Sequence, residues 1–361
     1  MTVDAPHRAE LALQIKAWGR EEGFAQLGIT HIDLSHDEPL LEAWLARGYH
    51  GEMAYMAAHG AKRSHPELLV PGTLSVISAT LNYLPASAYN MQAALDDHER
   101  AYIARYALGR DYHKVLRGRL RRLAARINTA IGPTGFRVFT DSAPVLEKAL
   151  ARNAGLGWIG KHTNLINRTQ GSWFFLGEIY TDLALPADPS YLADHCGSCT
   201  RCIDVCPTAA IVAPYTLDAR RCIAYLTIEF AGSIPHALRP LIGNRVFGCD
   251  DCQLVCPWNR YAEVASVPDF DVRHGLDATT LLELWAWNEA TFRARTEGSA
   301  LRRVSYQQWQ RNLAVGLGNS PPRPQTLAAL AARIDAATPL VVEHIEWAMA
   351  AQQAGLSGRH H

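Results

Sequence analysis

All eight cysteines of this chain of 361 residues lie between Cys196 and Cys256. The segment begins with the run C-x2-C-x2-C-x3-C-P, which extends from Cys196 to Pro207. This spacing brings three thiolates to one [4Fe–4S] cluster and turns the fourth toward a second cluster. The remaining four cysteines, which end in another Cys-Pro pair, complete a second set. The spacing therefore predicts two clusters that move electrons one at a time at low potential.

The first run has the spacing of bacterial ferredoxins, in which the fourth cysteine ligates the other cluster. By this exchange, cluster one is held by Cys196, Cys199, Cys202 and Cys256. Cluster two is held by Cys206, Cys222, Cys249 and Cys252. The second set is irregular, because residues 223–248 separate its second and third members. A small ferredoxin has no such insertion, which either contacts a cofactor or substrate or is a covering loop.

Two other uses of cysteine compete with this interpretation. Disulfides suit short secreted chains, and the first 25 residues contain charges throughout and no apolar signal region. Zinc is the stronger rival, because C-x2-C pairs also build zinc sites with four cysteine ligands. Zinc sites usually consist of two separated pairs, and their chemistry does not require the repeated Cys-Pro ending. The spacing favours clusters over both alternatives.

Composition is that of an ordinary globular protein, with 48% hydrophobic and 19% charged residues. Lys and Arg number 35 and Asp and Glu number 35, so the formal net charge is zero. A strongly basic, sequence-blind nucleic-acid binder is thereby disfavoured, although a local basic face is allowed. No apolar stretch reaches the length of about 18 residues that a membrane helix needs. We expect a cytoplasmic protein.

The chain is long enough for two or three domains, and we expect three regions. Residues 1–185 mix helices, predicted at 8–22, 39–47 and 114–131, with strands predicted at 24–29, 74–81, 136–140 and 173–179. Residues 186–262 form the cluster domain. Residues 263–357 are helical, with helices at 279–286, 310–319, 327–334 and 340–353. The final His360 and His361 are set aside as a possible tag remnant. The alternation in the first region predicts an α/β or α+β sheet layered with helices.

The destination of the electrons is indicated by residues 140–166, TDSAPVLEKALARNAGLGWIGKHTNLI. This stretch resembles the signature of epoxyqueuosine reductases, which are iron–sulfur, cobalamin-dependent enzymes of tRNA modification. Further matches are RYALGRDYHK at 105–114, RCIAYLTIE at 221–229, Arg302-Arg303 with QRN at 310–312, and Tyr55-Met56 with Arg63. The resemblance covers nearly the whole chain in order.

The resemblance implies an α+β multidomain fold. Its parts are an α/β cobalamin-binding domain like that of reductive dehalogenases, a ferredoxin-like domain with two [4Fe–4S] clusters, and a short helical-repeat (HEAT-like) element. It also implies base-off cobalamin without a protein histidine ligand. Corrinoid proteins with a histidine ligand use the motif Asp-x-His-x-x-Gly. This chain does not contain that motif, which is consistent with the absence of a histidine ligand. Asp111-Tyr-His113 is followed by Leu116 at the glycine position, and Asp96-Asp-His98 by Ala101.

The family reaction removes the epoxide oxygen of epoxyqueuosine at the tRNA wobble position and leaves queuosine. It consumes two electrons and two protons, so a general acid is required. Asp141 is the candidate acid, because it follows an apolar strand and burial against a corrin would raise its pKa. The alternative is an N-cap, for which Asp141 or Ser142 has suitable chemistry before Pro144.

The resemblance also implies contacts to the cofactor. The glycine-rich loop at 155–161 lets the backbone approach a bulky ligand, or it is a tight surface turn. It is not a phosphate loop, because His162 follows the lysine. The candidate cobalamin contacts are Arg63, Ala104, Asp141, Trp158, Lys161, Asn164, Leu165 and Ala224.

Two basic segments are candidates for contact with tRNA. The first, residues 100–126, has nine basic side chains and usually indicates a solvated helix face. The second has a better nucleic-acid signature, because guanidinium groups lie beside Tyr306 and Trp309. The preferred tRNA contacts are Arg302, Arg303 and Arg311.

The partners expected are a tRNA anticodon stem-loop and an external electron donor such as flavodoxin or ferredoxin, with the chain acting as a monomer. Three other functions compete. A cobalamin-dependent reductive dehalogenase would usually carry a twin-arginine export signal, and none is visible. A ferredoxin-type carrier leaves the N-terminal region unexplained. A zinc-dependent RNA-binding module requires the zinc interpretation of the cysteines.

Overall fold

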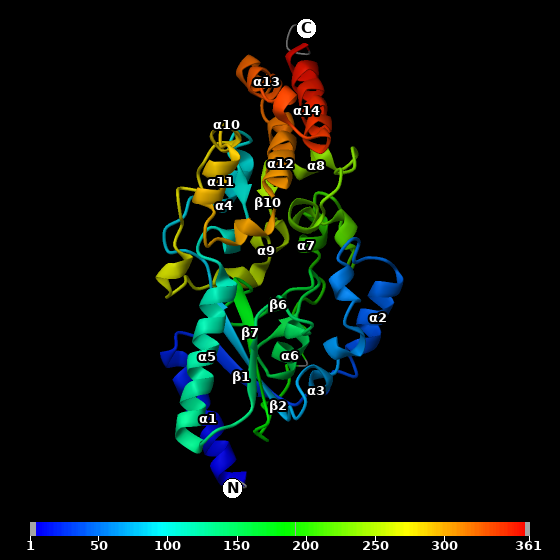
Figure 1. Cartoon of the computed structure of the whole chain (residues 1–361). Helices are drawn as coiled ribbons and strands as arrows, with labels where there is room; N and C mark the ends of the chain where they lie inside the picture. The colour runs from blue at the N-terminus through cyan, green and yellow to red at the C-terminus, as the bar shows by residue number, and fades with distance from the viewer. Residues whose placement is uncertain (1–4, 192, 358–361) are drawn as a thin grey trace.

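The computed structural model describes residues 5–191 and 193–357, so His360 and His361 lie outside the described residues. A sheet with its helices lies at one end of the molecule, and the C-terminal helices lie at the other (Figure 1). Helices α7 (Arg201–Asp204) and α9 (Asp251–Leu254), which belong to the cysteine segment, lie between them. The first region is not confined to the sheet end, because α4 (Met91–Asp96) lies beside the C-terminal helices α10 (Leu281–Trp285) and α11 (Glu289–Arg295).

The sheet has four strands in the order β1-β2-β7-β4. They are β1 (Gln26–Thr30), β2 (Ser75–Asn82), β7 (Phe174–Thr181) and β4 (Phe136–Phe139). All four predicted strands are confirmed, with ends shifted by one or two residues. Every pairing is antiparallel, with Gly28 opposite Ser78, Ser78 opposite Glu178, and Phe139 opposite Glu178. The mixed α/β class is therefore confirmed, and its main sheet is antiparallel.

Helices cover the two faces of the sheet. On one face lie α1 (Ala5–Glu21) and α5 (Tyr112–Ile131), and on the other lies α6 (Glu147–Asn153) (Figure 1). Strand β7 contributes Phe175 and Ile179 to the first face and Tyr180 to the second, as strand alternation requires. Glu178 has the same parity as Tyr180, so its carboxyl group lies on the α6 face.

Shorter elements connect these layers. They are α2 (Glu38–Ala46), α3 (Pro66–Leu69), α4 (Met91–Asp96), β3 (Tyr102–Ile103), β5 (Trp158–Ile159) and β6 (Leu165–Ile166). The cysteine segment adds β8 (Ile211–Ala213), β9 (Thr216–Leu217), α8 (Arg239–Ile242), β10 (Arg245–Phe247) and a π-helical turn at Tyr225–Glu229. Strand β10 pairs in parallel with β3. The insertion at 223–248 is therefore joined to the N-terminal region by backbone hydrogen bonds.

The C-terminal region is helical, as predicted. It contains α10 (Leu281–Trp285), α11 (Glu289–Arg295), α12 (Tyr306–Asn319), α13 (Pro324–Ala331) and α14 (Pro339–Ser357). Helices α10 and α12 begin with capping boxes at Thr280 and Ser305, which satisfy backbone N–H groups of the first turn. In the part of the chain that the structure describes, no helix combines the length and apolarity that crossing a membrane requires.

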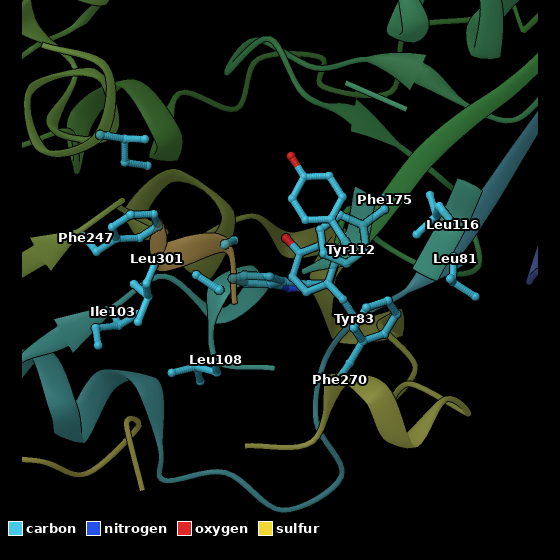
Figure 2. Packing of buried hydrophobic residues seen from close by; sticks show 14 of the residues in the cluster. Leu81, Tyr83, Ile103, Leu108, Tyr112, Leu116, Phe175, Phe247, Phe270 and Leu301 are labelled. Atoms are coloured by element: carbon cyan, nitrogen blue, oxygen red, sulfur yellow. The ribbon is translucent and has the colours of Figure 1, made fainter. Parts of the chain in front are cut away.

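One large hydrophobic cluster contains residues of all three predicted regions (Figure 2). The rings of Tyr112 and Phe175 stack at 4.2 Å between centroids and an angle of 7°. Phe270 packs on the same Phe175 ring at 5.2 Å, and Phe247 of the insertion also belongs to the cluster. The proposed boundaries at 185 and 262 stay predictions, and the core is continuous across them.

We expect Gly28→Ala to destabilise the fold, because a Cβ atom there would lie 2.0 Å from the carbonyl oxygen of Ala154. Overpacking against backbone should lower the free energy of unfolding by about 3 kcal/mol. Gly118→Ala is the matched control, since Gly118 lies within α5 and its nearest new contact would be Arg122 at 3.8 Å. That change should stabilise the helix by about 0.8 kcal/mol. Anaerobic chemical denaturation checks both values, and equal stability of the two variants would contradict the expectation.

Candidate active site and cluster ligands

A cavity of about 970 Å³ lies between the sheet region and the cysteine segment. Leu40, Leu41 and Trp44 form an apolar part of its lining. Residues 141–149 line it from the sheet side, and Tyr191, Asp194 and Tyr215 line it from the cysteine segment. Its volume is at the upper end of the range for cofactor pockets, which are mostly apolar with a few polar groups.

Asp141 lies in this cavity with its side chain 42% exposed. Its φ of 55° is in the left-handed region, which is uncommon for a residue other than glycine. Tyr112 donates a short hydrogen bond to Oδ2. His113 Nε2 lies 3.3 Å and Arg303 Nη1 3.2 Å from the same oxygen. The unusual backbone conformation is thus maintained by partners from two distant segments.

The electrostatics of Asp141 differ from the sequence-based expectation. Burial alone would raise its pKa, but the hydrogen bond from His113, the charge of Arg303 and the hydrogen bond from Tyr112 hold that pKa well below its usual range. The predicted raised pKa is therefore wrong for this arrangement. Burial opposes the charge of His113, but hydrogen bonds to Asp111 and Asp141 raise its pKa to about 9. At neutral pH the proton of this group lies on His113.

The capping alternative for Asp141 is also wrong. Helix α6 begins at Glu147, its N-cap is Leu146, and no side chain caps it. Neither Asp141 nor Ser142 serves as the cap. Strand β4, which Asp141 follows, pairs antiparallel with β7. What places Asp141 in the cavity is the set of contacts from α5 and Arg303.

Several groups around Asp141 were not singled out from the sequence. The sequence assigns no role to Tyr112 or Glu147, and it considers His113 only as part of a cobalt-ligand motif that the chain does not match. The backbone N–H of Asp141 donates to Glu147 Oε1, and the Glu147 carboxyl lies beside Glu178. Glu178 is fully buried in the strand FFLGEIYT. An ionisable residue in so apolar a strand was the available signal, since glutamate is almost never fully buried without a partner.

The cysteines fall into two neighbouring groups. Burial, followed by the proximity of Cys196, Cys256 and Cys199, raises the pKa of Cys202 to about 11. Burial, followed by the proximity of Cys222, Asp250, Cys202 and Cys206, raises the pKa of Cys252 well above its usual value, so Cys202 of the first group also lies near it. Cys249 also lies near Cys222. These neighbours fit the exchanged ligand sets predicted above, which remain a prediction.

Within residues 5–191 and 193–357, no three His, Cys, Asp or Glu side chains converge to hold one metal ion. Ligands of a bulky cluster are more widely spaced than ligands of one zinc ion.

Two further candidate cofactor contacts line the cavity with Asp141. Arg63 is 6% exposed, and its Nη2 donates to the Tyr55 carbonyl at 3.0 Å while its buried Nε has no hydrogen-bond partner. Trp158 is buried, stacks on Tyr191 at 5.5 Å, and its Nε1 lies near the Cys196 thiol, whose pKa it lowers against the larger effect of burial. Trp158 therefore lies between the cavity and the first cysteine run.

The other candidate cofactor contacts lie outside the lining. Lys161 Nζ donates to the carbonyls of Gly197 at 2.6 Å and Cys199 at 3.0 Å, so it supports the first cysteine run. Asn164 and Leu165 form the turn and strand beside it. Ala104 is buried, and its backbone N–H donates to the Phe247 carbonyl. Ala224 lies at the start of the π-helical turn. As cofactor contacts these residues remain predictions.

The predicted tRNA contacts have three different environments. Arg302 is exposed and lies in a cleft of about 490 Å³ with Lys114 and Arg293. Arg303 lies in the cavity, where it also binds Glu229 at 3.2 Å. Arg311 is fully buried and donates to the carbonyls of Phe230, Gly232 and Leu226, so its assignment as a tRNA contact is wrong. Trp309 is fully buried too and offers no stacking platform.

The long basic helix α5 has mostly structural partners at its C-terminal half. Arg122 binds Glu22 at 2.8 Å, and Arg126 binds Glu21. Arg119 donates to the carbonyl of Glu22. These contacts join α5 to the end of α1. The arginines in this half of the helix therefore lie on a solvated face and are paired within the protein.

Comparison with known families places these features in context. A family model described as a 4Fe-4S double cluster binding domain matches residues 195–259. The chain is therefore an iron–sulfur oxidoreductase with two clusters. A second model, described as Epoxyqueuosine reductase QueG, DUF1730, matches residues 63–142, which end at the catalytic candidate Asp141 and its neighbour.

Full-length relatives give the particular family. The epoxyqueuosine reductase of Pseudomonas aeruginosa is 60% identical over 95% of this chain and 95% of its own length. Those of Xanthomonas campestris and Escherichia coli are 58% and 54% identical and cover 96% and 95% of this chain, and 97% and 90% of their own lengths. The chain belongs to the epoxyqueuosine reductase family. This membership decides against the dehalogenase, the simple carrier and the zinc module.

Solved structures agree with the assignment. An epoxyqueuosine reductase in complex with an epoxyqueuosine-modified tRNA-Tyr stem loop superposes with a TM-score of 0.84 at 25% identity, and covers 95% of this chain and 90% of that one. The Bacillus subtilis enzyme, with TM-score 0.83, 25% identity and the same coverage, was captured with an aspartate-bearing catalytic loop swung out of the active site.

We expect Cys199→Ser and Cys222→Ser each to remove one cluster. Each serine takes one thiolate from a different set, so iron per chain should fall from about eight to about four. Asp204→Asn is the matched control, because Asp204 is exposed within the first run and is no cysteine. Iron and sulfide analysis after anaerobic purification checks this. Full iron in either serine variant, or zinc in place of iron in the parent, would contradict the ligand sets.

Proposed function

We propose that this protein reduces epoxyqueuosine to queuosine at the wobble position of tRNA. The main support is Asp141, whose carboxylate lies in a cofactor-sized cavity and is contacted by Tyr112, His113 and Arg303. The chain also belongs to the epoxyqueuosine reductase family. The overall change converts an epoxide, two electrons and two protons into an alkene and water.

We assign the electron supply to the cysteine segment. Cluster one would receive electrons at the surface, where Arg201 and Arg260 are exposed beside Cys202 and Cys256. These two positive charges suit a small acidic donor such as flavodoxin or ferredoxin. Cluster two would lie nearer the cavity. Cys222 packs in the same apolar cluster as Trp44, which lines the cavity.

We assign the cavity to base-off cobalamin, and its residues fit that group. The apolar lining suits the corrin face, and the unpaired buried Nε of Arg63 suits a corrin amide carbonyl. Cobalamin would supply a low-valent cobalt centre able to accumulate electrons that clusters deliver singly. His113 is engaged by Asp111 at 2.8 Å and by Asp141, so it is not free as a cobalt ligand.

We assign the protons to Asp141 and its partners. Opening an epoxide develops negative charge on oxygen, and a positioned acid stabilises that charge by donating a proton. The His113 imidazolium holds a proton beside Asp141 Oδ2, so Asp141 can pass it to an oxygen bound in the cavity. Tyr112 and Arg303 fix the carboxylate, and the stacked Phe175 fixes Tyr112.

The RNA contact is proposed at the cleft that contains Arg302. Lys114, Arg293 and Arg302 line it, with Asp111 and Glu297 as the acidic members. Asp111 is already bound by His113, and Arg293 is paired with Glu289 at 2.6 Å, so Lys114 and Arg302 are the cations that we propose for phosphate contact. This cleft adjoins the Asp141 site through α5, since Asp111 is the N-cap of that helix and His113 lies in its first turn. We further propose that the chain acts as a cytoplasmic monomer.

The function is tested by anaerobic reconstitution with iron, sulfide and cobalamin, followed by incubation with epoxyqueuosine-containing tRNA and a low-potential reductant. Nucleoside digestion and mass analysis should show queuosine. A protein that holds both clusters and cobalt, is reducible, and makes no queuosine would overturn the proposal.

We expect Asp141→Asn to retain iron and cobalt and to lose turnover by a factor on the order of 10³, because an amide cannot transfer the proton. Its affinity for the stem loop should change little. The single-turnover rate of queuosine formation is the measurement. Ser142→Ala is the control, since Ser142 lies beside Asp141 in the same cavity and carries no acid. Full activity of the asparagine variant would refute the role of Asp141.

We expect Arg302→Gln to weaken stem-loop binding and to lower the salt dependence of log Kd by about 0.7, the value for one phosphate contact on a single strand. Arg126→Gln is the control, because Arg126 is paired with Glu21 on the solvated face. Fluorescence anisotropy at several salt concentrations gives both slopes. Equal slopes for Arg302→Gln and the parent would place the RNA elsewhere.

A further inference from the structure

Two carboxyl groups outside the Asp141 network lie on the sheet side of the cavity. Glu147, the first residue of α6, lines the cavity and accepts the backbone N–H of Asp141 at Oε1. Glu178 lies behind it on the central strand β7 and is 0% exposed. Residues 141–147 therefore present two acids, Asp141 and Glu147, to one cavity.

The surroundings of Glu178 are unusual for a carboxylate. Neither of its side-chain oxygens has a hydrogen bond of ordinary geometry. Its cross-strand neighbour Ser78 has a buried hydroxyl that is likewise unpartnered, and its other neighbour is Phe139. An ionised carboxylate without compensation is very costly in such a place, whereas a protonated one is tolerated.

The charged and titratable groups that face the pair come from several elements. They are Asp141, Lys148, Arg63 and Tyr180, together with the two glutamates themselves. Burial, and then the negative charge of Asp141, raises the pKa of Glu147 to about 8. Burial, and then the proximity of Glu147, raises the pKa of Glu178 well above its usual value. Glu147 therefore carries a proton at neutral pH, and burial favours the protonated form of Glu178.

We propose that Glu147 is the second proton donor of the reaction and that Glu178 is the residue that positions it. This inference rests on the proposed function and goes beyond the role of Asp141. The epoxide needs one proton when its first C–O bond breaks and another when the oxygen leaves as water. The two electrons come from the external reductant. Asp141, supplied by His113, gives one proton, and Glu147 gives the other and is reprotonated from solvent through the open cavity.

The different roles proposed for Asp141 and Glu147 follow from their different surroundings. Asp141 is surrounded by cationic and hydrogen-bond donors, so it is ionised at rest and needs His113 as its proton source. For Glu147, burial and the charge of Asp141 outweigh the nearby Lys148, so Glu147 is neutral at rest and holds its own proton. Pairs of carboxyl groups whose environments push their pKa values apart are typical of acid–base sites.

Variants of Glu147 test the proposal through the pH profile. In Glu147→Gln the amide oxygen still accepts the Asp141 N–H, so the loop is kept while the proton is lost. We expect kcat to fall on the order of 10²-fold, KM for the stem loop to stay unchanged, and the alkaline limb near pH 8 to vanish. Glu147→Asp should restore part of the rate. Glu346→Gln, an exposed glutamate on α14, is the control. Wild-type kcat and an unchanged alkaline limb in Glu147→Gln would overturn the proposal.

Glu178→Leu tests the positioning role with a readout that a purely structural role would not move. Glu178 lies beside Glu147 and lowers the pKa of Glu147, so removing it should shift the alkaline limb to higher pH. Leucine suits the buried position and should allow folding. An alkaline limb at the parental pH in a folded Glu178→Leu would remove Glu178 from the proposal.

Infrared difference spectroscopy gives a readout that needs no turnover. The carbonyl stretch of a protonated carboxylic acid should titrate near pH 8 in the purified holoenzyme and be lost in Glu147→Gln. If that band persists in Glu147→Gln, the assignment of the proton is wrong. A parent that shows the band but makes no queuosine would overturn the proposed function while the protonated pair stands.

Discussion

The Asp141 carboxylate is the point at which distant parts of the chain meet. Tyr112 and His113 reach it from the start of α5, and Arg303 reaches it from the C-terminal region. Arg303 also binds Glu229 of the insertion, so one guanidinium joins the sheet region, the cysteine segment and the helical tail. Because Asp141 has a left-handed backbone, its place in the cavity depends on these contacts and not on local propensity.

The insertion at 223–248 is organised by the same tail. Arg311 donates to the carbonyls at Leu226, Phe230 and Gly232, and Asn312 donates to those of Thr227 and Val246. Two adjacent side chains of α12 thus satisfy the irregular backbone around the π-helical turn, which would otherwise leave buried carbonyls unpaired. The insertion in turn presents Glu229 to Arg303. The sequence leaves two roles open for the insertion, contact with a cofactor or substrate and a covering loop. The contact from Glu229 to Arg303 fits the first role better.

The sequence could predict features that depend on local interactions, but not features that depend on contacts between distant segments. The strands, the helix over 114–131 and the cluster chemistry arise from local periodicity and spacing, and these predictions were confirmed. The assignment of Arg311 failed because an arginine beside aromatic residues has the same local pattern whether it faces RNA or caps buried carbonyls. The pKa of Asp141 failed because His113, Tyr112 and Arg303 oppose burial, and two of them come from one helix turn that the sequence could not orient. Glu178 was missed because strand pairing decides which neighbours it meets.

In the proposed reaction, electrons and protons would approach the cavity from opposite sides. Trp158 and Trp44 line it on the side of the two cysteine groups, and each contacts a group that holds a predicted ligand, Cys196 or Cys222. Asp141 and Glu147 line it on the side of the sheet, backed by His113 and Glu178. Acidic protons held beside the proposed reducing centre would be consumed unproductively, so their separation across the cavity would have a chemical reason. The antiparallel sheet makes this separation possible, because its α6 face carries the carboxyl pair while its α5 face anchors the Tyr112 and His113 pair that controls Asp141.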